Sequence, residues 1–319
     1  MTYGLQAARR GRETGFANRP FQTKTGFRLF KTYYFTGFIV RFNIGAFTNL
    51  QQRVIVAVAG GLVLVGAIIG NEWTYFAVFF MICLLTQREF YRLVGLDGNA
   101  PLTFYGTLTG LFIFTLTFLV EKRLIGSEHY FWISPVASVI FFIKLYKKNE
   151  KKPFTNIAFT FLGIIYVAVP FSLLNICVFL HNAKYSHQII LGCLFLLWAS
   201  DTGAYFAGTR FGKTQLFARV SPKKSWEGSI GGTIAAILVA SLLAYFFTDL
   251  KYWHWYSIAL IIVVTGTYGD LVESLFKRSI AIKDSGTSIP GHGGFLDRFD
   301  GLLLSAPFIV AFLRIFGMD

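Results

Sequence analysis

The sequence predicts an all-α protein that crosses a membrane about nine times. The chain has 319 residues, of which 54% are hydrophobic, and its mean hydropathy is +0.55. Only 14% of the residues are charged, whereas soluble domains carry about 25%. Apolar segments recur along the chain, and several reach the roughly 20 residues that a membrane-spanning helix needs.

Nine apolar segments are expected to be transmembrane helices. They lie at about 53–70, 73–90, 102–120, 130–146, 154–180, 188–207, 229–248, 254–276 and 302–317. Before them comes a basic tail, 1–52, which we expect to be cytoplasmic or interfacial because its apolar stretch is too short to span. We divide the rest into N-terminal helices, 53–187, and a catalytic region with cytoplasmic loops, 188–319.

The distribution of basic residues predicts the orientation of these helices. If the N-terminus is inside and the helices alternate, the inside segments hold 25 of the 30 lysines and arginines, and the outside connections hold 4. Membrane proteins concentrate Lys and Arg on the cytoplasmic side, so the polar segments 208–228 and 277–300 should both face the cytoplasm. The net charge of +14 has the same explanation, and no stacking platform or recognition helix indicates nucleic-acid binding.

Two acidic residues, Asp201 and Asp270, lie inside predicted helices near their cytoplasmic ends. A charged side chain at the centre of a membrane helix costs about 2.5–3.5 kcal/mol, so it usually has a partner. A helix–helix hydrogen bond or a proton relay would explain either acid alone. Together, and beside basic loops, they indicate a site for a hard cation such as Mg²⁺, which prefers carboxylates and substrate phosphates.

Residues 221–228, Ser-Pro-Lys-Lys-Ser-Trp-Glu-Gly, resemble the start of a helix. Ser221 is the expected N-cap, and a proline follows at the first helical position. Lys223 and Lys224 would then lie on the first turn, where backbone N–H groups already favour an anion. A loop that merely orients the helix would also be basic, but the glycine-rich context favours phosphate binding. The Walker pattern is not met.

A second glycine-rich loop, Pro-Gly-His-Gly-Gly, contains His292. A lone histidine between glycines more often serves a turn than a metal, and zinc would need three or four N or S ligands. We therefore expect Gly291–Gly294 to let main-chain N–H groups approach phosphate oxygens.

Asp297 and Asp300 stand three residues apart at the start of the last predicted helix, on one face. Acids in a first turn complement the helix dipole, which contributes about 0.3–1 kcal/mol. They could also complete a cation site with Asp201 and Asp270. The two roles do not exclude each other.

The stretch 274–300 resembles the signature of the phosphatidate cytidylyltransferases, or CDP-diacylglycerol synthases. Every fixed position of that pattern is present: Ser274, Lys277, Arg278, Lys283, Asp284, Pro290, His292, Gly293, Gly294, Asp297, Arg298 and Asp300. The segments Trp-Ala-Ser-Asp-Thr-Gly-Ala-Tyr, Ser-Pro-Lys-Lys-Ser-Trp-Glu-Gly and Gly-Asp-Leu-Val-Glu-Ser are also similar to that family. These motifs span about 195–302. Earlier helices resemble the family only in hydropathy, and nothing is carried over to the tail.

The resemblance implies an enzyme that condenses CTP with phosphatidic acid to give CDP-diacylglycerol and pyrophosphate. It implies a requirement for Mg²⁺, with a second cation left open. It also implies a homodimer in the membrane, which is the inner membrane if the source is bacterial. The lipid phosphate is itself an anionic nucleophile, so catalysis needs positioning and charge neutralisation rather than a Ser or Cys nucleophile.

On this basis we assign roles to the candidate residues. The expected cation ligands are Asp270 and Asp297, followed by Asp201 and Asp300. The groups expected to bind the two substrates are Ser221, Lys223, Lys224, Lys277, Arg278, Lys283, Asp284, Gly291, His292, Gly293, Gly294 and Arg298. Lys283 and Asp284 would alternatively brace the loop as an ion pair. Asp270, Asp297, Lys277 and Arg278 are the expected catalytic residues.

Two other functions stay open. A secondary transporter or cation channel would use Asp201 and Asp270 as ion ligands, and it predicts mid-bilayer polar residues and an inverted repeat. Here the acids lie at helix ends and no repeat is visible. A nearer alternative is another CTP-dependent lipid enzyme, such as a polyprenol kinase or an archaeal ether-lipid cytidylyltransferase.

Overall fold

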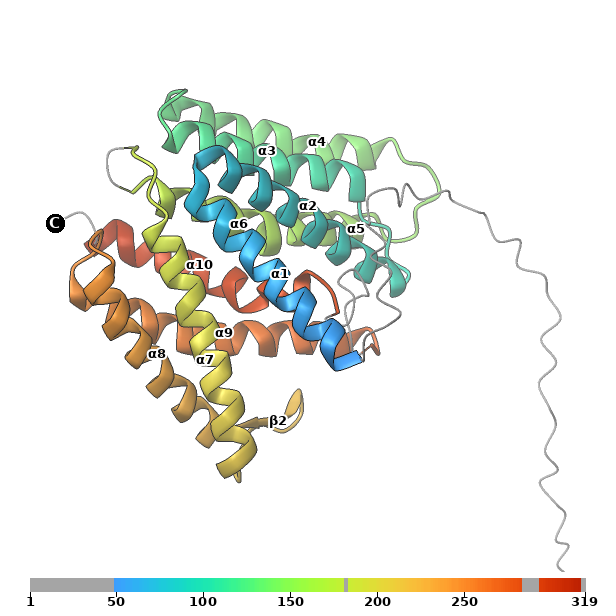
Figure 1. Cartoon of the computed structure of the whole chain (residues 1–319). Helices are drawn as coiled ribbons and strands as arrows, with labels where there is room; N and C mark the ends of the chain where they lie inside the picture. Colours follow the sequence, from blue (N-terminus) through green and yellow to red (C-terminus); the bar gives the residue numbers. More distant parts are fainter. Residues whose placement is uncertain (1–48, 181–182, 283–292, 317–319) are drawn as a thin grey trace, which may run out of the picture. The chain divides into compact units, whose positions relative to one another are not determined.

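The computed structural model describes residues 49–180, 183–282 and 293–316, with side chains from residue 54 onward. It is almost entirely helical, so the expected all-α fold class is confirmed (Figure 1). The helices are α1 (Asn49–Gly70), α2 (Glu72–Leu96), α3 (Thr103–Glu121), α4 (Ile133–Leu145), α5 (Pro153–Gly163), α6 (Val169–Val178), α7 (Gln188–Phe211), α8 (Trp226–Phe246), α9 (Tyr252–Ser279) and α10 (Leu296–Phe316). A 3₁₀ turn, η1 (Ser127–Trp132), precedes α4, and a hairpin of β1 (Gln215–Phe217) and β2 (Ser221–Ser225) precedes α8.

Each of the nine predicted apolar segments coincides with a helical rod in the described part of the chain. One rod consists of α5 and α6, which are joined by a π turn, η2 (Ile164–Ala168). Within the described residues, six rods are long and apolar enough to cross a membrane: Thr103–Glu121, Pro153–Val178, Gln188–Phe211, Trp226–Phe246, Tyr252–Ser279 and Leu296–Phe316. The described part of α1 is apolar but shorter, and α2 and α4 do not meet the same criteria. A multi-pass membrane protein is confirmed, whereas the count of nine spans stays a prediction.

The π turn has a local cause in Pro170. Proline lacks a backbone N–H and its ring clashes with the carbonyl four residues earlier, here that of Tyr166. The helix widens at this point, and the N–H of Val169 donates to the carbonyl of Ile164, five residues back. Single π turns of this kind are frequent at functional sites. Tyr166 lies within this turn.

Helices α9 and α10 lie side by side (Figure 1). They approach most closely at Gly269. A Cβ at that position would lie 2.5 Å from the carbonyl oxygen of Asp300, so no larger residue fits without moving α10. Small residues allow such close backbone approach in membrane helices. The C-terminal half of α9 and the start of α10 are therefore held together by main-chain contact.

One hydrophobic core joins the helices on both sides of residue 187. Helix α10 packs against α6 as well as α9, and the rings of Phe171 and Phe299 lie 5.7 Å apart. The N-terminal helices thus help to fix the position of α10. The domain boundaries expected from the sequence stay predictions.

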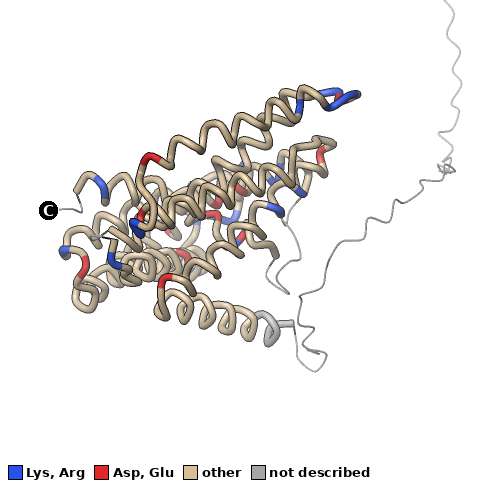
Figure 2. Tube along the Cα trace, turned by 90° about the horizontal axis from the view of Figure 1, so that it is seen from above, with Lys and Arg blue, Asp and Glu red and all other residues tan. Residues whose placement is uncertain are grey.

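Connections that the sequence assigned to one side of the membrane lie together. Lys122 pairs with Glu72 at 3.0 Å, and Arg314 pairs with Glu121 at 2.8 Å. We call these four residues the ion-pair end. All of them belong to connections or helix ends expected outside. In Figure 2 most of the helical length carries no charge, and Lys and Arg lie mainly at helix ends.

At the other end, segments expected inside also meet. The carboxylate of Glu89 on α2 accepts a hydrogen bond of 3.0 Å from the N–H of Phe295. Lys224 on the hairpin lies 2.5 Å from Asp270 on α9. These contacts join segments that were expected on the same side of the membrane, so they are consistent with helices that alternate in direction.

Candidate active site

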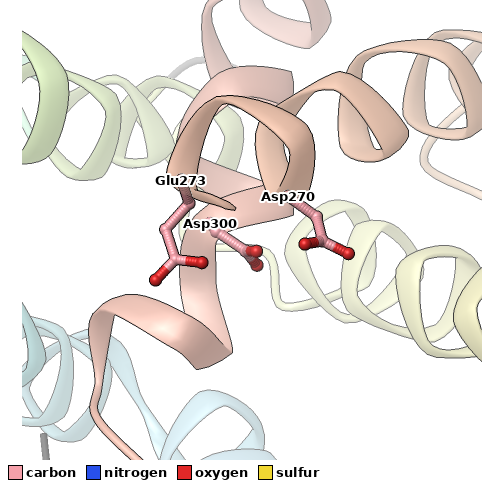
Figure 3. A group of neighbouring side chains, drawn as sticks. All are labelled: Asp270, Glu273 and Asp300. Carbon is pink, nitrogen blue, oxygen red and sulfur yellow. The ribbon is translucent and has the colours of Figure 1, made fainter. Parts of the chain in front are cut away.

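Three carboxylates converge where α9 crosses α10. Asp270 and Glu273 stand one turn apart on α9, and Asp300 comes from α10. One oxygen of each lies within 4.8 Å of the others. In Figure 3 the three side chains point to the same side of the crossing, with Asp300 between the other two. We call these residues the acid cluster.

The acid cluster combines buried and accessible groups. Glu273 is only 1% exposed, whereas the Asp270 side chain is 43% exposed. The hydroxyl of Ser274 donates to Asp270 at 3.3 Å, and the N–H of Gly301 donates to Asp300 at 2.7 Å. One oxygen of Glu273, Oε1, is buried and accepts no hydrogen bond from any residue that the structure describes. Buried polar atoms are nearly always satisfied, so this oxygen has capacity for a ligand.

The hairpin brings a lysine to the acid cluster. The ammonium of Lys224 lies 2.5 Å from Asp270, and it also approaches the carbonyl of Thr267 at 3.4 Å. Lys223, its neighbour, is exposed. The two lysines therefore differ: one touches the acids, and the other faces outward.

The expected helix start at Ser221 is wrong. Residues 221–225 form β2, which pairs with β1, and α8 begins at Trp226. Ser225 is the N-cap, and its hydroxyl accepts a hydrogen bond of 3.1 Å from the N–H of Gly228. Lys224 thus approaches the acids from a strand and not from a first helical turn.

Glu227 explains why the helix begins later. Its carboxylate accepts hydrogen bonds from the N–H of Lys213 at 3.1 Å and from that of Thr214 at 3.2 Å. These bonds hold the start of the hairpin against the first turn of α8. The resulting strand keeps Ser221 and Pro222 in extended backbone.

Lys277 joins the acid cluster to the start of α10. Its ammonium lies 2.6 Å from Glu273 and 2.7 Å from Asp297. Asp297 also accepts a hydrogen bond of 3.0 Å from the N–H of Gly294. Asp297 therefore lies beside the acid cluster, linked to it through Lys277. The guanidinium of Arg278 is exposed and donates to the carbonyl of Ile282 at 3.1 Å.

Asp201 approaches the site from α7. It interacts electrostatically with Lys224, Asp270 and Arg298, and Asp300 in turn interacts with Asp201. The residue is exposed and does not belong to the acid cluster. The structure thus brings Asp201 and Asp297 to the edge of the cluster and Asp270 and Asp300 into it.

The glycine-rich loop is described only at its end. Gly293 has a φ of +83°, and a Cβ there would lie 2.7 Å from the carboxylate of Asp297, so glycine suits the position. The N–H of Gly294 donates to Asp297. The predictions for Lys283, Asp284, Gly291 and His292 concern positions outside the described residues.

Sequence reasoning assigned no role to two groups beside these acids. Glu273 follows Asp270 by one turn, a spacing that could have placed it on the same helix face. Tyr166 lies in the π turn. Its hydroxyl is buried, has no hydrogen-bond partner in the described part of the chain, and interacts electrostatically with all three acids. Its ring lies 6.0 Å from that of Phe90, which stacks on Phe276 of α9 at 5.2 Å.

Comparison with known proteins identifies the family. Residues 51–316 match the family model described as "Cytidylyltransferase family". The chain belongs to the cytidylyltransferase family. The assignment made from the signature is confirmed, and so is the expectation of a nucleotidyltransferase.

Relatives of this cytidylyltransferase share more than the signature. A Haemophilus influenzae protein named phosphatidate cytidylyltransferase is 31% identical over 287 residues, which cover 82% of this chain and 98% of that protein. Proteins of the same name from Rickettsia typhi and Staphylococcus aureus are 39% and 37% identical over 160 and 157 residues. Those matches cover 69% of the Rickettsia protein and 58% of the Staphylococcus one.

Proposed function

We propose that this cytidylyltransferase transfers the cytidylyl group of CTP to phosphatidic acid. A phosphate oxygen of the lipid attacks the α-phosphorus of CTP, the bond to the β-phosphate breaks, and pyrophosphate leaves with its electron pair. The products are CDP-diacylglycerol and pyrophosphate. The observation that carries this proposal is the convergence of three carboxylates and two lysines at the α9–α10 crossing, inside the region that the family model matches.

The acid cluster fits a hard divalent cation. Its donors are carboxylate oxygens, and Oε1 of the buried Glu273 has no other partner among the described residues. We infer that Asp270, Glu273 and Asp300 hold Mg²⁺, which when bound neutralises nucleotide phosphates and stabilises the leaving pyrophosphate. Asp201 would add negative charge at the edge of the site, where a second cation could be shared with Asp270.

Basic side chains bind the phosphates of the two substrates. Lys224 places one positive charge against the cluster, and Arg298 places a second near Asp201. Lys277 is paired with Glu273 and Asp297, so its first role is to fix the buried Glu273. Positioning and charge neutralisation of this kind account for most of the catalysis in phosphoryl transfer. Ser221, Lys223, Arg278 and the 283–294 loop stay predicted contributors to substrate binding.

The proposed site faces the cytoplasm of a bacterial inner membrane. Lys and Arg are concentrated in the segments assigned to this side, and CTP is a cytoplasmic nucleotide. The homodimer implied by the family resemblance stays a prediction.

Purified protein in lipid nanodiscs, given labelled CTP, defined lipids and Mg²⁺, tests the proposal. We expect CDP-diacylglycerol and pyrophosphate from phosphatidic acid, and no product after chelation of divalent cations. Phosphorylated polyprenol with CDP would identify a polyprenol kinase instead. A CDP-linked ether lipid as the only product would identify the archaeal-type enzyme, and the absence of any product would favour a transporter.

A further inference from the structure

An apolar cavity of about 630 Å³ lies between α1, α2, α7 and the start of α10. This volume is within the range of about 300–1,000 Å³ typical of small-molecule sites. Its walls include Val63, Val78, Ile82, Leu194, Trp198 and Phe299. Arg298 is the one charged residue that lines it in the described part of the chain.

Arg298 connects this cavity to the proposed active site. It stands on the first turn of α10, between Asp297 and Asp300, and it interacts electrostatically with Asp201. Its side chain is exposed, and a guanidinium fork matches the oxygens of a phosphate. An apolar cavity with a single guanidinium beside the reacting groups is complementary to an amphiphile that has a hydrocarbon chain and a phosphate.

Two adjacent glycines, Gly60 and Gly61, form part of the α1 wall. A Cβ at either position would meet no heavy atom within 4 Å. Packing against the described residues therefore does not require glycine at either position. Glycine is unfavourable in a helix interior compared with alanine. Side chains at these positions would instead take up space in the cavity.

We propose that this cavity holds one acyl chain of the lipid substrate while Arg298 contacts the lipid phosphate. The inference rests on the proposed function and adds the location of the lipid chain. Helix α1 then determines which chains fit, because its glycine pair gives the cavity its width on that side.

Gly61→Leu tests this assignment, with Gly66→Leu as the matched control. Gly66 lies on the same helix, is equally free of neighbours within 4 Å, and does not line the cavity. We expect Gly61→Leu to raise the KM for dioleoyl phosphatidic acid about ten-fold, because hydrophobic pockets discriminate by single methylenes. The KM for dioctanoyl phosphatidic acid and for CTP should not change, and the control should match the unsubstituted protein throughout.

A second readout is independent of turnover. Phosphatidic acid with a diazirine in one acyl chain should label α1 and α7 on irradiation, and Gly61→Leu should label less than Gly66→Leu. An unsubstituted protein that makes no CDP-lipid would refute the proposed function itself. If the unsubstituted protein is active, normal KM values and normal labelling in Gly61→Leu would refute the acyl-chain site alone. An equal change in KM for the long-chain and the short-chain lipid would refute it as well.

Discussion

The two ends of the described helices carry the same residue types in different arrangements. At the ion-pair end each acid has its own cation, Glu72 with Lys122 and Glu121 with Arg314. At the acid cluster, three carboxylates lie within 4.8 Å of one another. The first arrangement fastens helix ends, whereas the second concentrates negative charge in one place.

The energetic difference between these ends indicates which of them has a function. Partly exposed ion pairs contribute about 0–1 kcal/mol each to stability. A buried carboxylate such as Glu273 is unfavourable unless its oxygens are satisfied, and its Oε1 has no hydrogen-bond partner among the residues that the structure describes. In the described part of the chain, neither acid of the ion-pair end has a buried oxygen without a hydrogen-bond partner, so this feature distinguishes the acid cluster from that end.

Neutralising an acid should have the largest effect at the acid cluster. We expect Asp270→Asn to lower CDP-lipid formation by at least about 10²-fold, because one charge that faces the phosphates is lost. The protein should remain in the membrane with an unchanged thermal transition. Glu72→Gln at the ion-pair end makes the same chemical change and should keep turnover within about two-fold, as expected for a surface pair. Full activity of Asp270→Asn would remove Asp270 from the cation site.

A smaller effect is expected at Tyr166. Removing its hydroxyl with Tyr166→Phe should weaken Mn²⁺ binding, measured by electron paramagnetic resonance, about ten-fold, as for other groups that surround metal ligands. Tyr91→Phe is the control, because its hydroxyl donates to the carbonyl of Thr160 at 2.7 Å. That change should lower stability by about 1 kcal/mol and leave Mn²⁺ affinity unchanged. Equal Mn²⁺ affinity in Tyr166→Phe and the unsubstituted protein would show that Tyr166 plays no part in cation binding.

The smallest effect is expected at the ion-pair end. Arg314→Met breaks the contact with Glu121 and should lower the free energy of unfolding by no more than about 1 kcal/mol. Turnover should be unchanged, since the pair lies away from the acid cluster. A large loss of activity together with normal stability would mean that the two ends are coupled, contrary to this comparison.

The helical rods could be predicted because hydrophobicity alone determines them. Asp270 and Asp300 could be identified for a related reason: a carboxylate beside apolar sequence stands out in any single chain. The spacing of Asp297 and Asp300 placed both on the start of α10, but it did not reveal which of them joins Asp270 and Glu273. Asp300 does so at the point where the backbones of α9 and α10 touch at Gly269, whereas Asp297 pairs with Lys277, further along α9.

The remaining errors come from contacts between residues distant in sequence. Ser221 and Ser225 both offer a helix cap, and Glu227 decides between them by binding the backbone of Lys213 and Thr214. Tyr166 lies in the π turn before Pro170, and its ring packs against that of Phe90 on α2. No local pattern in the sequence records either contact.

The contact at Gly269 has a consequence for ion choice. Because main chains abut there, the distance between the backbones that carry Asp270 and Asp300 has little room to adjust. A rigid spacing favours ions of one radius: Mg²⁺ demands short, near-octahedral bonds, whereas Ca²⁺ needs longer bonds and more ligands. We therefore expect Ca²⁺ to bind the proposed site more weakly than Mg²⁺.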